Sequence, residues 1–229
     1  GSTWRYRENE ITNYLLIGLD REAFGSFVGY QNGGQADFLV VLSIDRINRA
    51  ITPVMLDRDT MTEVQTYGIF GHPSGSREMQ LCLAQAYFTQ GSSGSDNTAK
   101  AVEGLLHGVK IDHFVTLDIS AVPLLNDAVG GVEVTLQDDF TGYDPCMVQG
   151  ATVRLTGEQA EYFVRGRMTV ADGTNASRMK RQQQYISGFL TQLHRELEKE
   201  PDKMVELLND VSGHMHTDTP EEILLRDAD

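Results

Sequence analysis

Five short apolar runs along the chain have the length and the flanking residues of buried β-strands. Runs of this length, bounded by turn-forming residues, favour strands over helices. Asp-Arg-Ile-Asn-Arg lies between the second and third runs and is typical of a hairpin turn. The predicted strands are 13–20, 37–45, 50–57, 113–119 and 131–136.

Apolar residues at helical spacing lie between and after these runs. The predicted helices are 77–88, 97–108 and 120–131, a segment opened by Thr156 and Gln159 at capping-box spacing, a long helix from Ser177, and a last helix with Pro220 at its first position. Strands and helices that alternate in this way predict an α/β fold, in a three-layer α-β-α arrangement around a central mixed sheet. We expect one domain over 1–229.

Composition limits the classes of partner. The chain has 229 residues, with 19 Lys or Arg against 33 Asp or Glu, and a formal net charge of −14. A nonspecific nucleic-acid binder needs a basic surface, so we expect no nucleic-acid partner. The acidic residues concentrate in 196–229, which we interpret as a solvated helical C-terminal extension.

The cysteines and histidines give weak signals. Cys82 and Cys146 have neither CxxC nor metal-site spacing, and the sequence leaves open whether they pair. His214 and His216 lie in a polar linker, where we expect them to be solvated rather than metal-bound. No run approaches the length of a transmembrane helix.

Basic residues cluster in one short segment, 163–184. Arg165 and Arg167 follow a predicted short helix, and Arg178 and Gln182 share a face at the start of the long helix. The planar guanidinium groups of arginines near a helix N-terminus can bind a phosphate or pyrophosphate through paired N–H donors. The alternative is that these groups pair with the plentiful acids or solvate a helix.

Aspartates stand where the first apolar runs begin or end. Asp20 ends the first predicted strand, Asp37 begins the second, and the third runs into Asp57, Arg58 and Asp59. Ligands bind α/β sheets at strand ends, and carboxylates there suit Mg²⁺ together with substrate phosphate oxygens. Each acid taken alone also serves as a common turn former.

Seven segments follow one another in a specific order along the chain. They are NYLLIGLD, QADFLVVLSID, VMLDRDTM, LAQAYF, AVEGLLHGVKIDHFVTLDISAVPLLNDAVGGVEVTL, LTGEQAEYFVRGR and SRMKRQQQ. This ordered set resembles the LytR-CpsA-Psr family of cell-envelope proteins, and the resemblance covers about residues 12–195.

The resemblance implies a Mg²⁺-dependent phosphotransferase at the extracellular face of the cell membrane, held by an N-terminal anchor upstream of this chain. Such enzymes move a glycopolymer from a polyprenyl-pyrophosphate carrier to peptidoglycan through a phosphodiester bond. The implied site residues are Asp20 and Asp37 for the metal, Asp37 and Arg58 for catalysis, and Arg58, Arg165, Arg167, Arg178 and Gln182 for the pyrophosphate.

The chain departs from the family pattern at four positions. Gln35 and Ala36 replace an arginine and a serine or threonine, and Cys82 and Ala84 replace a lysine and an asparagine. We therefore expect a slower enzyme rather than an inactive one. Two other functions stay open: a non-catalytic, regulatory domain that binds polyprenyl phosphate or an anionic glycan, and a nuclease or sugar hydrolase that uses Asp37 with Asp59.

Three structural expectations follow from the resemblance. The guanidinium groups of Arg165, Arg167 and Arg178 should converge on one cavity, with Arg58 nearby. Asp20 and Asp37 should approach closely enough to share one Mg²⁺. A prenyl tail should occupy a dry cavity, with Leu39, Val41, Leu83, Ala86 and the helix 122–129 as its candidate lining.

Overall fold

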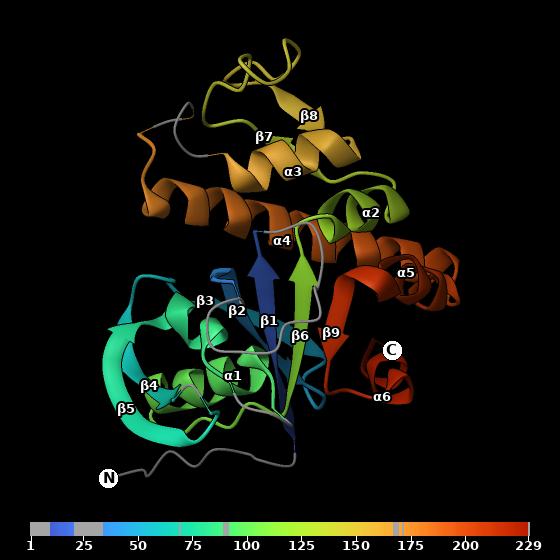
Figure 1. Cartoon of the computed structure of the whole chain (residues 1–229). Helices are drawn as coiled ribbons and strands as arrows, with labels where there is room; N and C mark the ends of the chain where they lie inside the picture. Colours follow the sequence, from blue (N-terminus) through green and yellow to red (C-terminus); the bar gives the residue numbers. More distant parts are fainter. Residues whose placement is uncertain are drawn as a thin grey trace, which may run out of the picture. The chain divides into compact units, whose positions relative to one another are not determined.

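A computed structural model describes residues 10–20, 34–68, 70–88, 92–166, 170 and 172–228 (Figure 1). The chain divides into two compact units that interleave in sequence. Unit 1 comprises Gly1–Leu19, Ser26–Thr116 and Thr217–Thr219, and unit 2 comprises Asp20–Gly25, Leu117–His216 and Pro220–Asp229. The single domain expected over 1–229 stays a prediction.

A five-stranded sheet forms the centre of the fold, in the order β3-β2-β1-β6-β9. Its strands are β1 (Ile11–Leu19), β2 (Ala36–Asp45), β3 (Ala50–Met55), β6 (His113–Asp118) and β9 (Met215–Thr217). β1, β2 and β3 pair antiparallel, whereas the arrows of β1 and β6 point the same way in Figure 1. The predicted α/β class with a central mixed sheet is confirmed.

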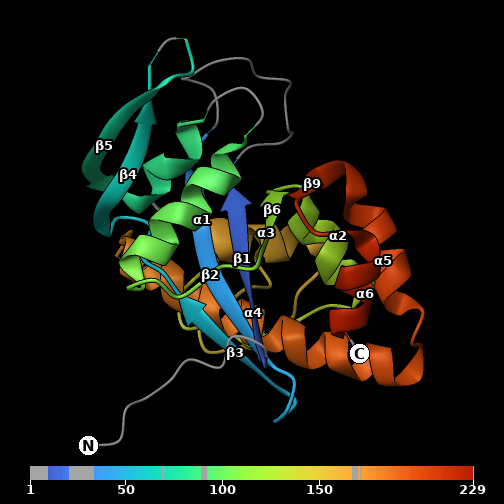
Figure 2. The same cartoon turned by 90° about the horizontal axis from the view of Figure 1, so that it is seen from below.

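The apolar runs form strands because their side chains fill the core of unit 1. Leu15, Ile17, Leu39 and Val40 are at most 1% exposed. Figure 2 shows the three antiparallel strands of unit 1 side by side. At about 25 cal/mol per Å² of buried apolar surface, such side chains supply the main stabilisation of the sheet.

The pairing of β1 with β2 is irregular at Asp37. Gly18 faces Phe38 and Leu19 faces Ala36, so the register of the pairing shifts across Asp37. Gly18 allows this close approach, because a Cβ there would lie 2.9 Å from the Cβ of Phe38. Bulges of this kind reorient a side chain and often lie beside functional sites.

The predicted helix over 77–88 is wrong. Its first residues belong to β5 (Pro73–Gln80), which pairs with β4 (Met61–Tyr67), and its remainder forms a 3-10 helix, η1 (Leu81–Ala86). β4 was not predicted either. Val64 of β4 pairs with Arg77 of β5, more than ten residues later in the sequence. Periodicity within a short segment does not indicate pairing between residues so far apart.

Helix α1 (Gly94–Leu105) fixes η1 in place through buried polar contacts. Its N-cap, Ser93, forms a capping box with Asp96. Asn97 donates through Nδ2 to the Ala84 carbonyl at 3.1 Å, and a Cβ on Gly94 would lie 2.0 Å from the Gln85 carbonyl oxygen. This close packing sets the position of Cys82 in η1.

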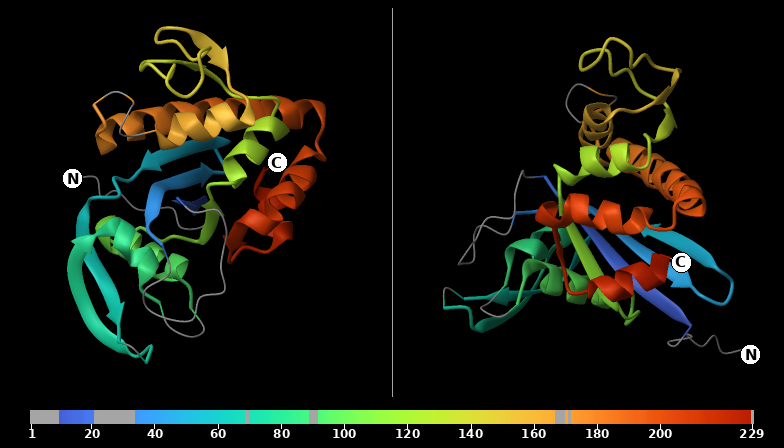
Figure 3. Two further views of the ribbon diagram at one scale, coloured as in Figure 1. Left: turned by 45° about the horizontal axis from the view of Figure 1, so that its top comes forward. Right: turned by 90° about the vertical axis from the view of Figure 1, so that its right-hand side faces the viewer.

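Unit 2 is mainly helical. Its elements are α2 (Ala121–Ala128), β7 (Glu133–Thr135), β8 (Thr152–Arg154), α3 (Gly157–Arg165), α4 (Asn175–Lys199), α5 (Lys203–Val211), η2 (Ser212–His214) and α6 (Glu221–Ala228). The predicted capping box of Thr156 and Gln159 opens α3. Figure 3 shows α3 alongside the long α4, with the β7–β8 hairpin next to α3.

A titratable carboxylate, Asp172, lies two residues before Thr174, the N-cap of α4. Asp172 accepts hydrogen bonds from Ser177, from the backbone N–H of Thr174 at 3.0 Å and from its hydroxyl at 2.8 Å. These bonds, that from Ser177 first, lower the pKa of Asp172 to about 2. A depressed carboxyl pKa means that the charged form stabilises the fold.

We expect Asp172 to add stability at neutral pH that is lost in acid. The contribution is complete above the unfolded carboxyl pKa of about 3.9, and disappears as pH falls through about 2. The free energy of unfolding, measured in urea between pH 5 and pH 2, should therefore fall more for the native chain than for Asp172→Asn. Asp139→Asn is the control, because Asp139 accepts the backbone N–H of Thr141 in a similar turn. Equal pH slopes for the native chain and Asp172→Asn would contradict the assignment.

Candidate functional site

Arg58 lies in a tight turn directly after β3. The Thr60 N–H donates to the Asp57 carbonyl at 3.0 Å, and the Asp59 N–H donates to the Asp57 side chain at 2.9 Å. The Cys82 N–H donates to the Arg58 carbonyl at 3.0 Å, which ties this turn to η1. The backbone beneath the Arg58 side chain is therefore held from both sides.

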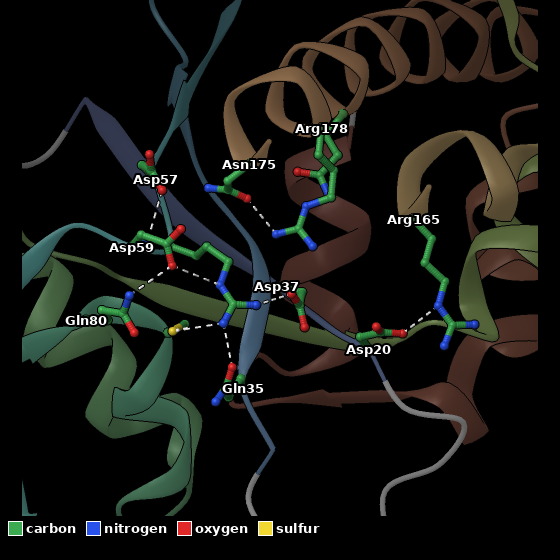
Figure 4. A network of polar contacts seen from close by, with 12 residues as sticks. Asp20, Gln35, Asp37, Asp57, Asp59, Gln80, Arg165, Asn175 and Arg178 are labelled. Atoms are coloured by element: carbon green, nitrogen blue, oxygen red, sulfur yellow. Dashed lines mark hydrogen bonds and ion pairs between the residues drawn. The ribbon is translucent and has the colours of Figure 1, made fainter. Parts of the chain in front are cut away.

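Four side chains of unit 1 surround the Arg58 guanidinium (Figure 4). Nη1 donates to Asp37, and Nη2 donates to Gln35 and, at 3.2 Å, to the sulfur of Cys82. Nε lies 3.5 Å from Asp59 Oδ1. The Arg58 side chain is only 12% exposed, so this cluster combines two carboxylates with one largely buried cation.

Burial and neighbouring charge shift the pKa values of Arg58 and Cys82 in opposite directions. Burial alone would lower the pKa of Arg58, but the Asp37 carboxylate and the bond to Cys82 outweigh it, and the net pKa is raised. Burial raises the pKa of the Cys82 thiol, and Arg58 offsets this only in part. The cluster therefore holds a permanent guanidinium against a neutral thiol.

Acidic groups outnumber basic ones around this turn. Asp59 also accepts from the Gln80 amide at 3.3 Å. Asp37, Asp57 and Asp59 bring three carboxylates to a region whose central cation is Arg58. An anionic phosphate would meet repulsion here unless a further cation joined it.

In unit 2, Arg165 and Arg178 extend from the end of α3 and the start of α4 to the same side (Figure 4). Arg165 Nε lies 2.8 Å from Asp20, and Nη1 lies 3.1 Å from Glu161. Arg178 is only 3% exposed and donates to the Asn175 side chain at 2.7 Å. Arg167, predicted with them, lies outside the described residues.

Arg181 and Gln182 hold the C-terminal end of α3. Arg181 is 4% exposed, donates to the carbonyls of Phe163 and Gly166, and lies 2.8 Å from Asp138. Gln182 donates to the Val164 carbonyl at 3.3 Å. These bonds satisfy carbonyls that a helix end leaves open. Gln182 as a pyrophosphate ligand stays a prediction.

Sequence reasoning missed the pairing of His214 with a buried carboxylate. His214 Nδ1 lies 3.1 Å from both carboxylate oxygens of Asp118, whose side chain is fully buried. His214, expected to be solvated, is thus held by a carboxylate 96 residues earlier in the chain. Separation on this scale leaves no local sequence signal.

That Asp20 and Asp37 share one metal ion stays a prediction. Asp37 belongs to unit 1 and Asp20 to unit 2, and each is ion-paired with an arginine of its own unit. Within the described ranges, no three His, Cys, Asp or Glu side chains gather closely enough to hold a metal ion. Cys82 and Cys146 do not pair: both are free thiols, the first buried and the second exposed.

In the part of the chain with described structure, no helix is both long and apolar enough to cross a membrane.

Fold and site together define a class: an α/β protein with arginines and aspartates at the end of a mixed sheet and at helix termini. The chain belongs to the LytR_cpsA_psr family, whose sequence pattern matches residues 3–228. The match includes the acidic C-terminal segment, beyond the resemblance over 12–195.

Named relatives agree with this membership. The chain is 28% identical over 183 residues to the polyisoprenyl-teichoic acid–peptidoglycan teichoic acid transferase TagU of Bacillus cereus, covering 80% of this chain and 53% of that protein. It is 29% identical over 211 residues to the protein of the same name from Enterococcus faecalis, covering 91% and 62%. The chain thus spans roughly half to three fifths of these relatives.

A solved structure shares the fold. The crystal structure of protein gbs0355 from Streptococcus agalactiae superimposes with a TM-score of 0.74 at 23% identity, covering 96% of this chain and 74% of that one.

Proposed function

We propose that this chain transfers a glycopolymer from a polyprenyl-pyrophosphate carrier to peptidoglycan through a phosphodiester bond. The observation that carries the proposal is the Arg58 cluster, which places Asp37 and a largely buried guanidinium at a β-bulge. Family membership and relatives named teichoic acid transferases support the same reaction.

The reaction requires charge to be neutralised at two places. A hydroxyl oxygen of the acceptor attacks the phosphorus that carries the glycan, a new P–O bond forms, and the bond from that phosphorus to the bridging oxygen breaks. The glycan becomes a phosphodiester on the acceptor, polyprenyl phosphate leaves, and the hydroxyl proton passes to a base. Fixed cations stabilise such transition states because negative charge spreads over the phosphoryl oxygens.

In this proposal the residues of each unit have separate roles. Arg58 stabilises charge on the transferred phosphoryl group, and Asp37, held by Arg58, accepts the hydroxyl proton. Arg165, Arg167 and Arg178 bind the pyrophosphate, since arginine forks bind phosphate oxygens in pairs. Gln182 is the remaining predicted ligand of this group.

The donor chemistry fits Mg²⁺, with Asp37 and Asp20 as the ligands we propose. Mg²⁺ is commonly bound by one or two carboxylates together with substrate phosphates, so two aspartates suffice. Both carboxylates already hold a cation, the guanidinium of Arg58 or Arg165. When bound, Mg²⁺ would neutralise phosphate charge that the surplus of carboxylates around Arg58 otherwise repels.

One observation favours a second function, a regulatory domain that binds polyprenyl phosphate or an anionic glycan without turnover. The aspartates assigned to the metal are each ion-paired with an arginine. Their negative charge is therefore already balanced without a metal ion. A binder would need the arginines but not the carboxylates.

The cellular placement is also part of the proposal. The reaction joins a lipid-linked donor to a cell-wall acceptor, so the chain would work at the extracellular face of the membrane. An N-terminal anchor outside this sequence would hold it there.

Turnover with matched variants tests the proposal. The assay is the release of polyprenyl phosphate from a lipid-linked sugar pyrophosphate, with Mg²⁺ or with EDTA. We expect release that depends on Mg²⁺ and falls about 100-fold or more in Asp37→Asn, as for the loss of a general base. Asp210→Asn, an exposed acid on α5, is the control. Binding of the lipid-linked sugar with no release under any condition would favour the regulatory function.

A further inference from the structure

Two tyrosine rings lie together on the surface of unit 2. Tyr143 is 41% exposed and Tyr162 is 36% exposed. Their ring centroids are 5.1 Å apart, and the ring planes are tilted by 31°. Tyr143 belongs to the loop 136–151 between β7 and β8, and Tyr162 belongs to α3. We call this pair the tyrosine platform.

The tyrosine platform is fixed from below. Phe140 is fully buried and its ring centroid lies 5.6 Å from that of Phe163 and 6.4 Å from that of Tyr143. The Arg181 guanidinium lies over the Phe140 ring, 5.6 Å from its centroid. An exposed pair built on a buried aromatic core has little conformational freedom to lose when a ligand binds.

Backbone bonds hold the loop that carries Tyr143. The N–H groups of Tyr143 and Asp144 donate to the Phe140 carbonyl at 2.8 and 3.0 Å, and the Phe140 N–H donates to Met147 at 3.1 Å. The Gln159 amide donates to Asp144 at 2.7 Å, which ties the loop to α3. That bond and the Cys146 N–H lower the pKa of Asp144, so its carboxylate stays charged.

An acidic loop carries Tyr143. Asp144 follows Tyr143 directly and accepts from Gln159, which lies three residues before Tyr162 on the same face of α3. The loop 136–151 also contains Asp139 and Asp138, the second of which pairs with Arg181, and it has no Lys or Arg in its sequence. Flat apolar rings beside a carboxylate acceptor suit a ligand with apolar C–H faces and many hydroxyl donors. The acidic loop disfavours an anionic ligand.

We infer that the tyrosine platform binds an uncharged glycan strand, with pyranose faces against Tyr143 and Tyr162 and sugar hydroxyls donating to the Asp144 carboxylate. Tyr162 lies three residues before Arg165 on α3, so the glycan would lie one helical turn from a predicted pyrophosphate ligand. If the proposed function holds, this surface receives the N-acetylated amino-sugar acceptor rather than the anionic donor polymer. The glycan binding itself does not depend on turnover.

Binding of a neutral oligosaccharide tests the inference. The probe is tetra-N-acetylchitotetraose, titrated into the intact chain and followed by NMR chemical-shift changes. We expect Tyr143→Ala and Tyr162→Ala each to weaken binding on the order of tenfold, as for an exposed aromatic anchor, while Tyr143→Phe stays within about twofold because it keeps the ring. Tetragalacturonate, an anionic strand of equal length, should bind on the order of tenfold more weakly.

Controls separate this inference from folding and from the proposed function. Phe70→Ala removes an aromatic side chain in unit 1 that is 83% exposed, and it should leave binding unchanged. Retained NMR dispersion in the tyrosine variants excludes unfolding. Chitotetraose binding that persists in a chain with no transferase activity would overturn the proposed function alone. No chitotetraose binding by the native chain, or equal binding by Tyr143→Ala and Tyr162→Ala, would overturn the inference.

Discussion

Replacing Arg58 with alanine is expected to lower kcat/KM for polyprenyl phosphate release by about 100- to 1,000-fold, the cost of removing one fixed group that stabilises transition-state charge. The substitution has two effects. It removes the largely buried cation of the cluster and leaves Asp37 and Asp59 without the guanidinium with which both are ion-paired. Steady-state kinetics on a lipid-linked sugar pyrophosphate measure the loss.

Arg58→Lys separates charge from geometry. Lysine keeps a cation but cannot bond Asp37, Gln35 and Cys82 at once as the guanidinium does. We expect Arg58→Lys to recover part of the activity, and Arg77→Ala, an arginine of β5 outside the cluster, to keep nearly all of it. Activity in Arg58→Ala within a few-fold of the native chain would remove Arg58 from the catalytic role.

Replacing Arg181 with alanine is expected to lower the free energy of unfolding by about 3 kcal/mol or more, typical for one partner of a buried ion pair. The guanidinium bonds the Phe163 and Gly166 carbonyls and Asp138. Without the guanidinium, these buried acceptors lose their hydrogen-bond donor. The Phe140 ring also loses its cation–π contact with Arg181. Urea denaturation at neutral pH measures the change.

Arg165→Ala is the matched control, because it removes the same side chain from a site with 48% exposure. Its ion pairs with Asp20 and Glu161 lie near solvent, so the expected loss is below about 1 kcal/mol. Similar losses of unfolding free energy in Arg165→Ala and Arg181→Ala would show that burial does not determine how much each arginine contributes to stability.

Local pattern was sufficient for most of the fold. The apolar runs of β1, β2, β3 and β6 were predicted to within a few residues, and so was the capping box of α3. These signals are local, since strand runs and caps depend on neighbouring residues. β4 and β5 were missed because their stability comes from pairing with each other.

The sequence predicted which residues belong to the site, but it did not predict all of the contacts between them. Arg58 and Asp37 were assigned to catalysis, and the structure brings them together. Gln35 and Cys82 were noted only as departures from the family pattern, yet both bond the same guanidinium. The sequence also did not distinguish Arg181, which holds α3, from the arginines around it, because that distinction depends on burial.

The formation of the phosphodiester product tests the central claim most directly. The chain, a lipid-linked sugar pyrophosphate, Mg²⁺ and a peptidoglycan acceptor are incubated together and analysed by mass spectrometry. The account predicts an acceptor heavier by one sugar phosphate, with polyprenyl phosphate released in equal amount, and neither product in Asp37→Asn. Free sugar phosphate and an unmodified acceptor, or no product with any lipid-linked glycan tried, would contradict it.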